Sequence, residues 1–237
     1  DDGYKDNYEI AYPIFKKHKV PFTVYITTSF PEKSAVLWWY VLEDFLITKN
    51  EVTLSNGKSF VCKTKQEKTD AFMKIREIII SFEPNEFLNK LNELFSNYRI
   101  NWYKYSNELT MNWDEIQNLA KDEIVTIAGH TSNHFALNRL SKDQILKEVL
   151  DANQLIESKI DKKINHFSYP FGSRNEIGNR EFEIIKSLNF KTVTTTREGN
   201  VYHAHSNYRE CIPRRMLSEN FKINDIGKIR KRRVLTF

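Results

Sequence analysis

The segment PFTVYITT, residues 21–28, decides the fold class, because β-branched and aromatic side chains after a turn-forming proline are typical of a buried strand. Three similar strands are predicted at residues 123–128, 164–169 and 190–196. Long segments with helical spacing separate them, and the clearest of these covers residues 141–160. Because strands and helices alternate, the sequence predicts an α/β fold.

The helix predicted at residues 141–160 has a recognisable start. Ser141 and Gln144 match the capping-box pattern, and Ile145 and Val149 begin an apolar stripe along one face. Further helices are predicted at residues 8–19, 112–121 and 179–188.

Residues 31–110 interrupt the alternation, and we interpret them as an insertion or subdomain within a single domain of residues 1–237. The Asn56-Gly57 pair between two alternating runs predicts a hairpin with a type I′ turn, which needs positive φ at both central residues. Helices are predicted around it at residues 35–47, 65–82 and 85–98.

The net charge of +5 is concentrated in the basic C-terminal tail, residues 222–237, and the rest of the chain is balanced. This distribution argues against a nucleic-acid-binding surface spread over the fold. The longest apolar stretches are broken by polar residues before they reach the ~18 residues that span a bilayer. Cys62 and Cys211 are expected to be free core thiols.

The segment HTSNH places His130 and His134 four residues apart after a predicted strand. On a helical turn both rings would lie on one face and could reach one metal ion. The pair Asp1-Asp2 offers a carboxylate ligand and a second carboxylate to contact a water, since neighbouring side chains point in different directions. Spacing alone leaves two alternatives open: histidines with purely structural partners, and an Asp-Asp-Gly turn at the chain terminus.

Three motifs together resemble those of the polysaccharide deacetylase family, the NodB-homology carbohydrate esterases. They are DDGY at residues 1–4, HTSNHFALNRLS at residues 130–141 and FSYPFG at residues 167–172. WDEI at residues 113–116 also fits. The third motif is typical of a subgroup with an aromatic-Pro-aromatic-Gly sequence.

The resemblance implies a distorted, incomplete (β/α) barrel, with the motifs on loops at the carboxyl ends of strands. It also implies a first strand just before Asp1, which this sequence does not contain. By the same resemblance Asp2, His130 and His134 bind the metal, and Asp1 is the general base. A backbone N–H of the third motif, that of Phe171, would complete the oxyanion hole, because a proline has no N–H.

Two parts of the family pattern are altered in this sequence. The family's general acid is a C-terminal histidine, for which His205 is preferred here over His203. Many members carry an arginine in the third motif where this chain has Ser168. Arg214, in an Ile-Pro-Arg segment, is the candidate that replaces it and keeps the pKa of the catalytic aspartate low.

The resemblance therefore predicts a metal-dependent N-deacetylase acting on an N-acetylated sugar in a surface glycan or its lipid-linked precursor. Zinc is the expected ion, and cobalt, nickel or iron would fit a similar donor set. A metal-dependent amidase on a non-sugar amide and a catalytically degenerate glycan-binding domain are the alternatives.

Two interpretations of the basic tail stay open: a solvated helix end, which is favoured, and a peripheral contact with anionic lipid or with a substrate phosphate. The sequence leaves both the cellular compartment and the oligomeric state open, with a bacterial-type cytoplasmic or peripheral membrane location slightly favoured over secretion.

Overall fold

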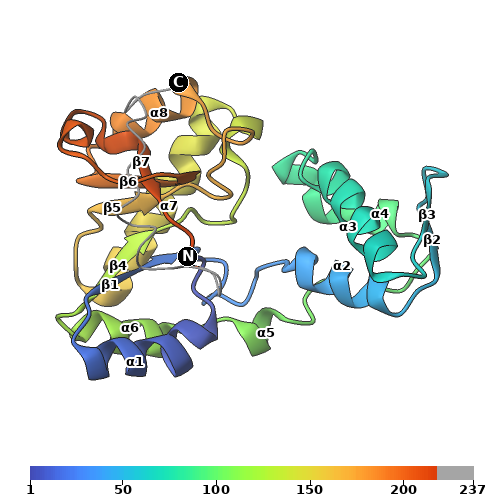
Figure 1. Cartoon of the computed structure of the whole chain (residues 1–237), viewed down its shortest axis with the longest axis horizontal. Helices are drawn as coiled ribbons and strands as arrows, with labels where there is room; N and C mark the ends of the chain where they lie inside the picture. Colours follow the sequence, from blue (N-terminus) through green and yellow to red (C-terminus); the bar gives the residue numbers. More distant parts are fainter. Residues whose placement is uncertain (218–237) are drawn as a thin grey trace. The chain divides into compact units, whose positions relative to one another are not determined.

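The structure is a computed structural model that describes residues 1–217 (Figure 1). The basic tail at residues 222–237, and the lipid or phosphate contact predicted for it, lie outside the described residues. The chain forms two compact units, Asp1–Thr126 and Ile127–Phe237, and we describe each by itself. The single domain of residues 1–237, with an insertion at residues 31–110, stays a prediction.

The central sheet confirms the α/β fold class. Within residues 1–217 its five strands have the order β1-β4-β5-β6-β7, and the pairs β4–β5, β5–β6 and β6–β7 are parallel. The strands are β1 (Phe22–Ile26), β4 (Val125–Gly129), β5 (His166–Ser168), β6 (Thr192–Glu198) and β7 (Ile212–Arg214). The first four confirm the predicted strands, whereas β7 was not predicted, because three residues around a proline carry too little pattern. The parallel sheet is consistent with the predicted distorted barrel.

In the first unit, the helix predicted at residues 8–19 is present but irregular. A π-helical turn, Asn7–Ala11, leads directly into α1 (Tyr12–His18). Pro13 lies in the first turn of α1, where its missing N–H costs little. The predicted α6 (Trp113–Lys121) is confirmed and begins with a capping box formed by Asn112 and Glu115.

The region of residues 31–110 has a hydrophobic core of its own. It contains α2 (Trp38–Ile47), the antiparallel pair β2 (Glu51–Thr53) and β3 (Ser59–Val61), α3 (Lys65–Ile79), α4 (Phe87–Leu94) and α5 (Ser106–Leu109). The buried side chains of this core all come from residues 38–102 and include Trp38, Leu42, Ile75, Leu91 and Trp102. The predicted helices and hairpin of this region are therefore confirmed.

The type I′ turn predicted at Asn56-Gly57 is wrong. Only Gly57 has a positive φ, 82°, and Asn56 does not. The Gly57 N–H donates to the Leu54 carbonyl, and the Leu54 N–H donates to the Lys58 carbonyl. Three residues therefore lie between the paired residues Leu54 and Lys58, where a type I′ turn has two. The turn from Leu54 to Gly57 closes the hairpin, with the left-handed residue at Gly57.

In the second unit, α7 (Lys142–Ile160) and α8 (Asn179–Lys186) confirm the predicted helices. The Ser141–Gln144 capping box is present at the start of α7. The apolar face of α7 is fully buried, as expected from its spacing, through Ile145, Val149, Ala152 and Ile156. This face fixes the rotation of α7 about its axis and so decides which polar residues of α7 point toward the loop after β4.

Both cysteines are free, as predicted, with Cys62 buried and Cys211 half-buried rather than in the core. Within residues 1–217, every helix is too short or too polar to cross a bilayer.

Candidate active site

The N-terminal aspartates lie in a backbone segment that the first unit holds in place. Asp2 and Gly3 have φ angles of 76° and 100°. The Asp2 carbonyl accepts the Thr27 N–H at 3.1 Å, just after β1, and the Gly3 carbonyl accepts the Met111 N–H at 3.0 Å. These bonds fix the course of the backbone on both sides of the Asp2 side chain.

Tyr4, which sequence reasoning passed over, supports the same segment. Its hydroxyl accepts a hydrogen bond from Trp39 Nε1 at 2.9 Å, and its ring packs edge-on against Phe30 and Tyr40. Burial, followed by the nearby charge of Asp2, raises the pKa of Tyr4 above its ordinary value. Tyr4 is therefore a neutral phenol at physiological pH.

The two motif histidines lie in a loop after β4, as the resemblance implied, and not on the helical turn assumed in the spacing argument. Thr131 and His134 have left-handed φ angles of 69° and 58°, and the His134 N–H donates to Thr131 Oγ1 at 3.0 Å. The reversed backbone nevertheless places the ring centroids of His130 and His134 5.0 Å apart. The predicted proximity is correct, but the backbone that produces it is different.

His130 has a defined tautomer. It is buried, and its Nδ1 lies 2.7 Å from the carbonyl oxygen of Ser168, which can only accept. Nδ1 therefore carries the proton, and Nε2 carries the lone pair that a metal ion needs. A histidine oriented by a backbone carbonyl in this way is typical of metal ligands.

Glu148 on α7 holds the middle of the histidine loop, and sequence reasoning missed it. Its carboxylate accepts the backbone N–H groups of Ser132 and Asn133 at 3.1 and 2.8 Å and the Asn133 amide at 2.6 Å. Burial raises the pKa of Glu148, and these hydrogen bonds oppose the shift. A glutamate on an otherwise polar helix face gives no sequence signal for this role.

The third motif forms a tight turn beside His134. Gly172 N–H donates to the Pro170 carbonyl at 2.7 Å, and Phe171 between them has a φ of 60°. Thr196 Oγ1 donates to the Phe171 carbonyl at 2.6 Å. The Phe171 ring lies 4.8 Å from that of His134, centroid to centroid. The candidate oxyanion residue thus contacts a candidate ligand directly.

Arg214, the last residue of β7, contacts both β6 and the third motif. Its Nε donates to the Thr195 carbonyl at 2.9 Å, and one terminal nitrogen donates to Ser168 Oγ at 3.2 Å. Ser168 therefore contacts Arg214 through its side chain and His130 through its carbonyl. The Arg214 guanidinium of β7 therefore lies beside the third motif, where the sequence resemblance predicts a positive charge.

His205 lies in a short 3-10 helix, His203–Asn207, after β6, and it is buried whereas His203 is exposed. Its Nδ1 lies 2.9 Å from the Tyr202 backbone nitrogen and 3.2 Å from the Tyr202 carbonyl oxygen. Within the described part of the chain, its hydrogen bonds stay between residues 202 and 208. The role of His205 as general acid stays a prediction.

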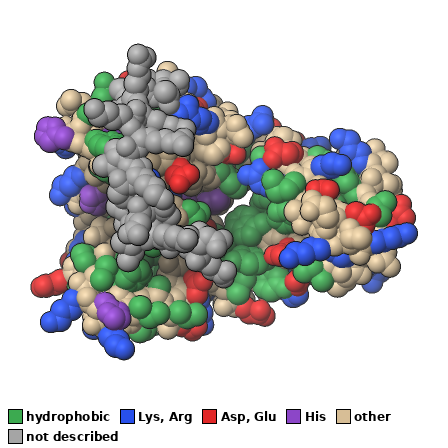
Figure 2. All heavy atoms as spheres, in the orientation of Figure 1, with side chains coloured by type: hydrophobic (Ala, Val, Ile, Leu, Met, Phe, Trp, Pro, Cys, Tyr) green, Lys and Arg blue, Asp and Glu red, His purple; other side chains and the backbone are tan. Residues whose placement is uncertain are grey.

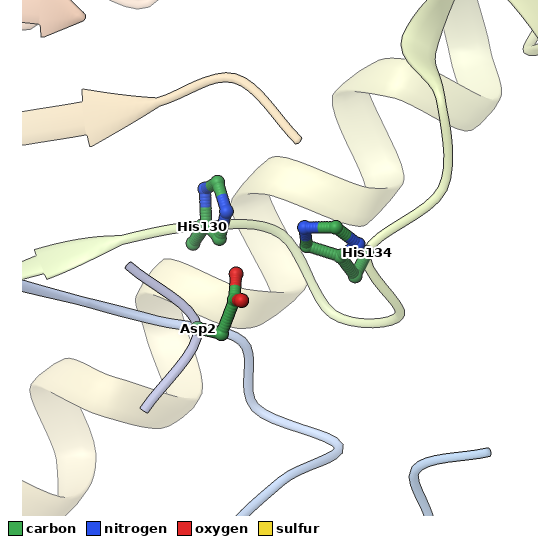
Figure 3. Close-up of side chains that lie close together, drawn as sticks. All are labelled: Asp2, His130 and His134. Carbon is green, nitrogen blue, oxygen red and sulfur yellow. The ribbon is translucent and has the colours of Figure 1, made fainter. Parts of the chain in front are cut away.

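Asp2, His130 and His134 form the one metal-ligand group found among residues 1–217, and their ligand atoms all lie within 4.8 Å of one another. Figure 3 shows the Asp2 carboxylate directed toward the two imidazole rings. One carboxylate and two imidazoles are a donor set that suits zinc and similar divalent ions and leaves coordination positions open. Because His130 carries its proton on Nδ1, its Nε2 lone pair can bind such an ion. The three residues therefore fit a divalent metal ion.

The family model for polysaccharide deacetylases matches residues 74–193, about half of the chain. This chain belongs to the polysaccharide deacetylase family. The matched residues include the histidine loop and the third motif, and they leave Asp1, Asp2, His205 and Arg214 outside. Enzymes of this carbohydrate esterase family are metal-dependent hydrolases of glycan N-acetyl groups. No sequence among curated proteins matches the chain significantly.

Solved structures of deacetylases resemble the fold of this polysaccharide deacetylase family member. The chain is similar to the deacetylase PplD of Streptococcus pyogenes in complex with acetate, with 16% identity and a TM-score of 0.58. That match covers 96% of this chain and 66% of PplD, so the chain spans just under two thirds of the PplD structure.

Two further structures show the same fold. The de-N-acetylase from Aggregatibacter actinomycetemcomitans has 13% identity and a TM-score of 0.54, over 96% of this chain and 71% of its own. IcaB from Ammonifex degensii has 14% identity and a TM-score of 0.51, over 93% of this chain and 66% of its own.

The turn of the third motif gives a prediction about stability. Gly172 has a φ of 62°, and a Cβ there would lie 2.8 Å from the Thr196 backbone nitrogen. Gly57 has a φ of 82° with no atom within 4 Å of its Cβ position. We expect Gly57→Ala to cost about 1–2 kcal/mol for the left-handed backbone alone, and Gly172→Ala to cost at least about 1 kcal/mol more through the clash. Urea unfolding of both variants measures the difference, and equal losses would contradict the tight turn.

Proposed function

We propose that this protein removes the N-acetyl group from an N-acetylated sugar in a surface glycan or its lipid-linked precursor, releasing acetate. The observation that carries the proposal is the group of Asp2, His130 and His134 in a chain of the polysaccharide deacetylase family. The solved structures of similar fold include a deacetylase in complex with acetate and a de-N-acetylase, which supports the same reaction class.

Asp2, His130 and His134 would hold a divalent ion, with zinc the expected one. When bound, the ion supplies Lewis-acid activation of water and polarisation of the acetamido carbonyl. The protein's own contribution is the fixed orientation of the ligands: the Ser168 carbonyl sets the tautomer of His130, and the Phe171 ring packs against His134.

Asp1 would act as the general base, accepting a proton as the water oxygen bonds to the carbonyl carbon. Such a base must begin ionised, so it needs a neighbouring positive charge to keep its pKa low. Arg214 would supply that charge, and its hydrogen bond to Ser168 in the third motif supports this role.

The remaining steps need a donor for the developing oxyanion and a proton for the leaving amine. The Phe171 N–H would donate to the carbonyl oxygen, because the tight turn fixes the peptide that carries it. When the C–N bond breaks, His205 in its imidazolium form would deliver the proton of Nε2 to the amine nitrogen and be left as the neutral ring. The Tyr202 carbonyl oxygen lies 3.2 Å from Nδ1 and can accept the N–H that the imidazolium carries there.

The test of the proposed function measures metal content and acetate release together. The expected result is one divalent ion per chain and acetate release from N-acetylglucosamine oligomers or from lipid-linked N-acetylated sugars, the two substrates being assayed separately. Acetate from the lipid-linked sugar alone would identify the precursor as substrate. A stoichiometric ion without acetate from either substrate would contradict the proposal and favour an amidase on a non-sugar amide. Failure to bind metal after reconstitution would favour a catalytically degenerate glycan-binding domain.

The division of roles gives a second prediction. Asp1→Asn and Arg214→Ala are expected to retain the ion and to lower kcat by about 10²–10⁴-fold, because both changes act on the base. Asp2→Asn is expected to weaken metal affinity by more than about 100-fold, since it removes a direct ligand rather than a supporting residue. Calorimetric titration of the metal-free protein with zinc, beside steady-state kinetics, separates the two effects. The same phenotype in all three variants would refute this assignment.

A further inference from the structure

We propose that Glu148 is the positioning residue of the histidine loop, which we define as residues 130–134, and that it sets the protein's affinity for a divalent metal ion. This inference rests on the metal site of the proposed function. Glu148 lies on α7, fourteen residues after His134, and neither the sequence motifs nor the family resemblance assigns it a role.

Glu148 binds the two residues between the histidines. Its Oε2 accepts the N–H groups of Ser132 and Asn133 at 3.1 and 2.8 Å, and its Oε1 accepts the Asn133 side-chain amide at 2.6 Å. The Glu148 backbone carbonyl also accepts Ser132 N–H at 3.0 Å and Ser132 Oγ at 3.2 Å. One residue of α7 therefore holds the centre of the loop through both its side chain and its main chain.

The histidine loop needs such support because its backbone conformation is unfavourable by itself. Thr131 and His134 both have left-handed φ angles, which side chains with a Cβ seldom adopt, and Thr131 is β-branched. Strained residues of this kind persist only where the surrounding structure holds them. Without the carboxylate of Glu148, the Asn133 N–H would lose its acceptor, and the Ser132 N–H would keep only the Glu148 backbone carbonyl.

The helix that carries Glu148 is itself fixed against the loop. Ile145 and Val149 on either side of Glu148 are fully buried. One turn further along α7, the Asn153 side chain packs against the end of β4, where a Cβ at Gly129 would lie 2.3 Å from Asn153 Oδ1. Gly129, immediately before His130, therefore leaves room for the Asn153 amide in this position. Glu148 is thus a carboxylate on a rigid element at a fixed distance from the loop.

The geometry assigns support of the loop, rather than metal ligation, to this carboxylate. Both of its oxygens already accept hydrogen bonds from the loop, and Glu148 is outside the group of ligand atoms that lie within 4.8 Å of one another. Its effect on the metal is therefore indirect, through the positions of His130 and His134.

The experiment compares Glu148→Gln with a matched control on the same helix, Glu157→Gln. Glu157 also accepts a backbone N–H, that of Ile164 at 2.9 Å, and a lysine ammonium, that of Lys163 at 2.8 Å, but it lies at the other end of α7. Zinc affinity of the metal-free proteins is measured by calorimetric titration, and amide hydrogen exchange of Asn133 is measured by NMR without metal. Circular dichroism confirms that each variant is folded.

We expect Glu148→Gln to weaken zinc binding by about 10–100-fold and to speed exchange of the Asn133 amide, because an NH₂ group replaces one acceptor. Glu157→Gln is expected to leave both unchanged. Zinc affinity of Glu148→Gln within twofold of wild type, or an equal loss in Glu157→Gln, would overturn the inference. If the wild-type protein binds no zinc, the proposed function fails. Hydrogen exchange then tests the positioning role by itself, and an unchanged exchange rate of the Asn133 amide in Glu148→Gln would overturn it.

Discussion

The hydrogen bond from His130 Nδ1 to the Ser168 carbonyl is the interaction on which the candidate site depends. It joins the loop after β4 to the carboxyl end of β5, two segments that the parallel sheet brings to the same edge. It also decides the protonation of His130, leaving the Nε2 lone pair for a metal ion. Because Ser168 accepts a hydrogen bond from Arg214 through its side chain, the same residue connects His130 to β7, a strand that the sequence did not predict.

Backbone strain is concentrated in the three motifs. Eight residues other than glycine have a positive φ among residues 1–217, and four of them, Asp2, Thr131, His134 and Phe171, lie in the motif segments. Such conformations cost free energy and are retained where neighbouring groups hold them. Each motif has such groups: Thr27 and the backbone near residue 111 for the aspartates, Glu148 for the histidine loop, and Thr196 for the third motif. Figure 2 shows many charged side chains on the visible surface, whereas these supporting contacts use backbone groups, the Thr196 hydroxyl and one carboxylate, that of Glu148.

The sequence was informative wherever a pattern repeats along the chain. Strands such as β1, helices such as α7 and the capping box at Ser141 follow from periodicity and local hydrogen bonding. The strand β7 could not be predicted in this way, because three residues are too few to show a period. The helical turn assumed for His130 and His134 was wrong, because spacing alone does not reveal a left-handed backbone. Among the candidate site residues, the proximity of Asp2 to both histidines was predictable from the motifs. Glu148 was not, because its role arises from a contact between residues sixteen positions apart.

The central claim is that Asp2, His130 and His134 together hold a catalytic metal ion, and X-ray absorption spectroscopy of the zinc-loaded protein tests it most directly. The account predicts two imidazole nitrogens at about 2.0–2.1 Å and oxygen ligands at about 2.0–2.2 Å, with one imidazole lost in His130→Ala. A sulfur ligand at about 2.3 Å, or a spectrum that His130→Ala leaves unchanged, would contradict it.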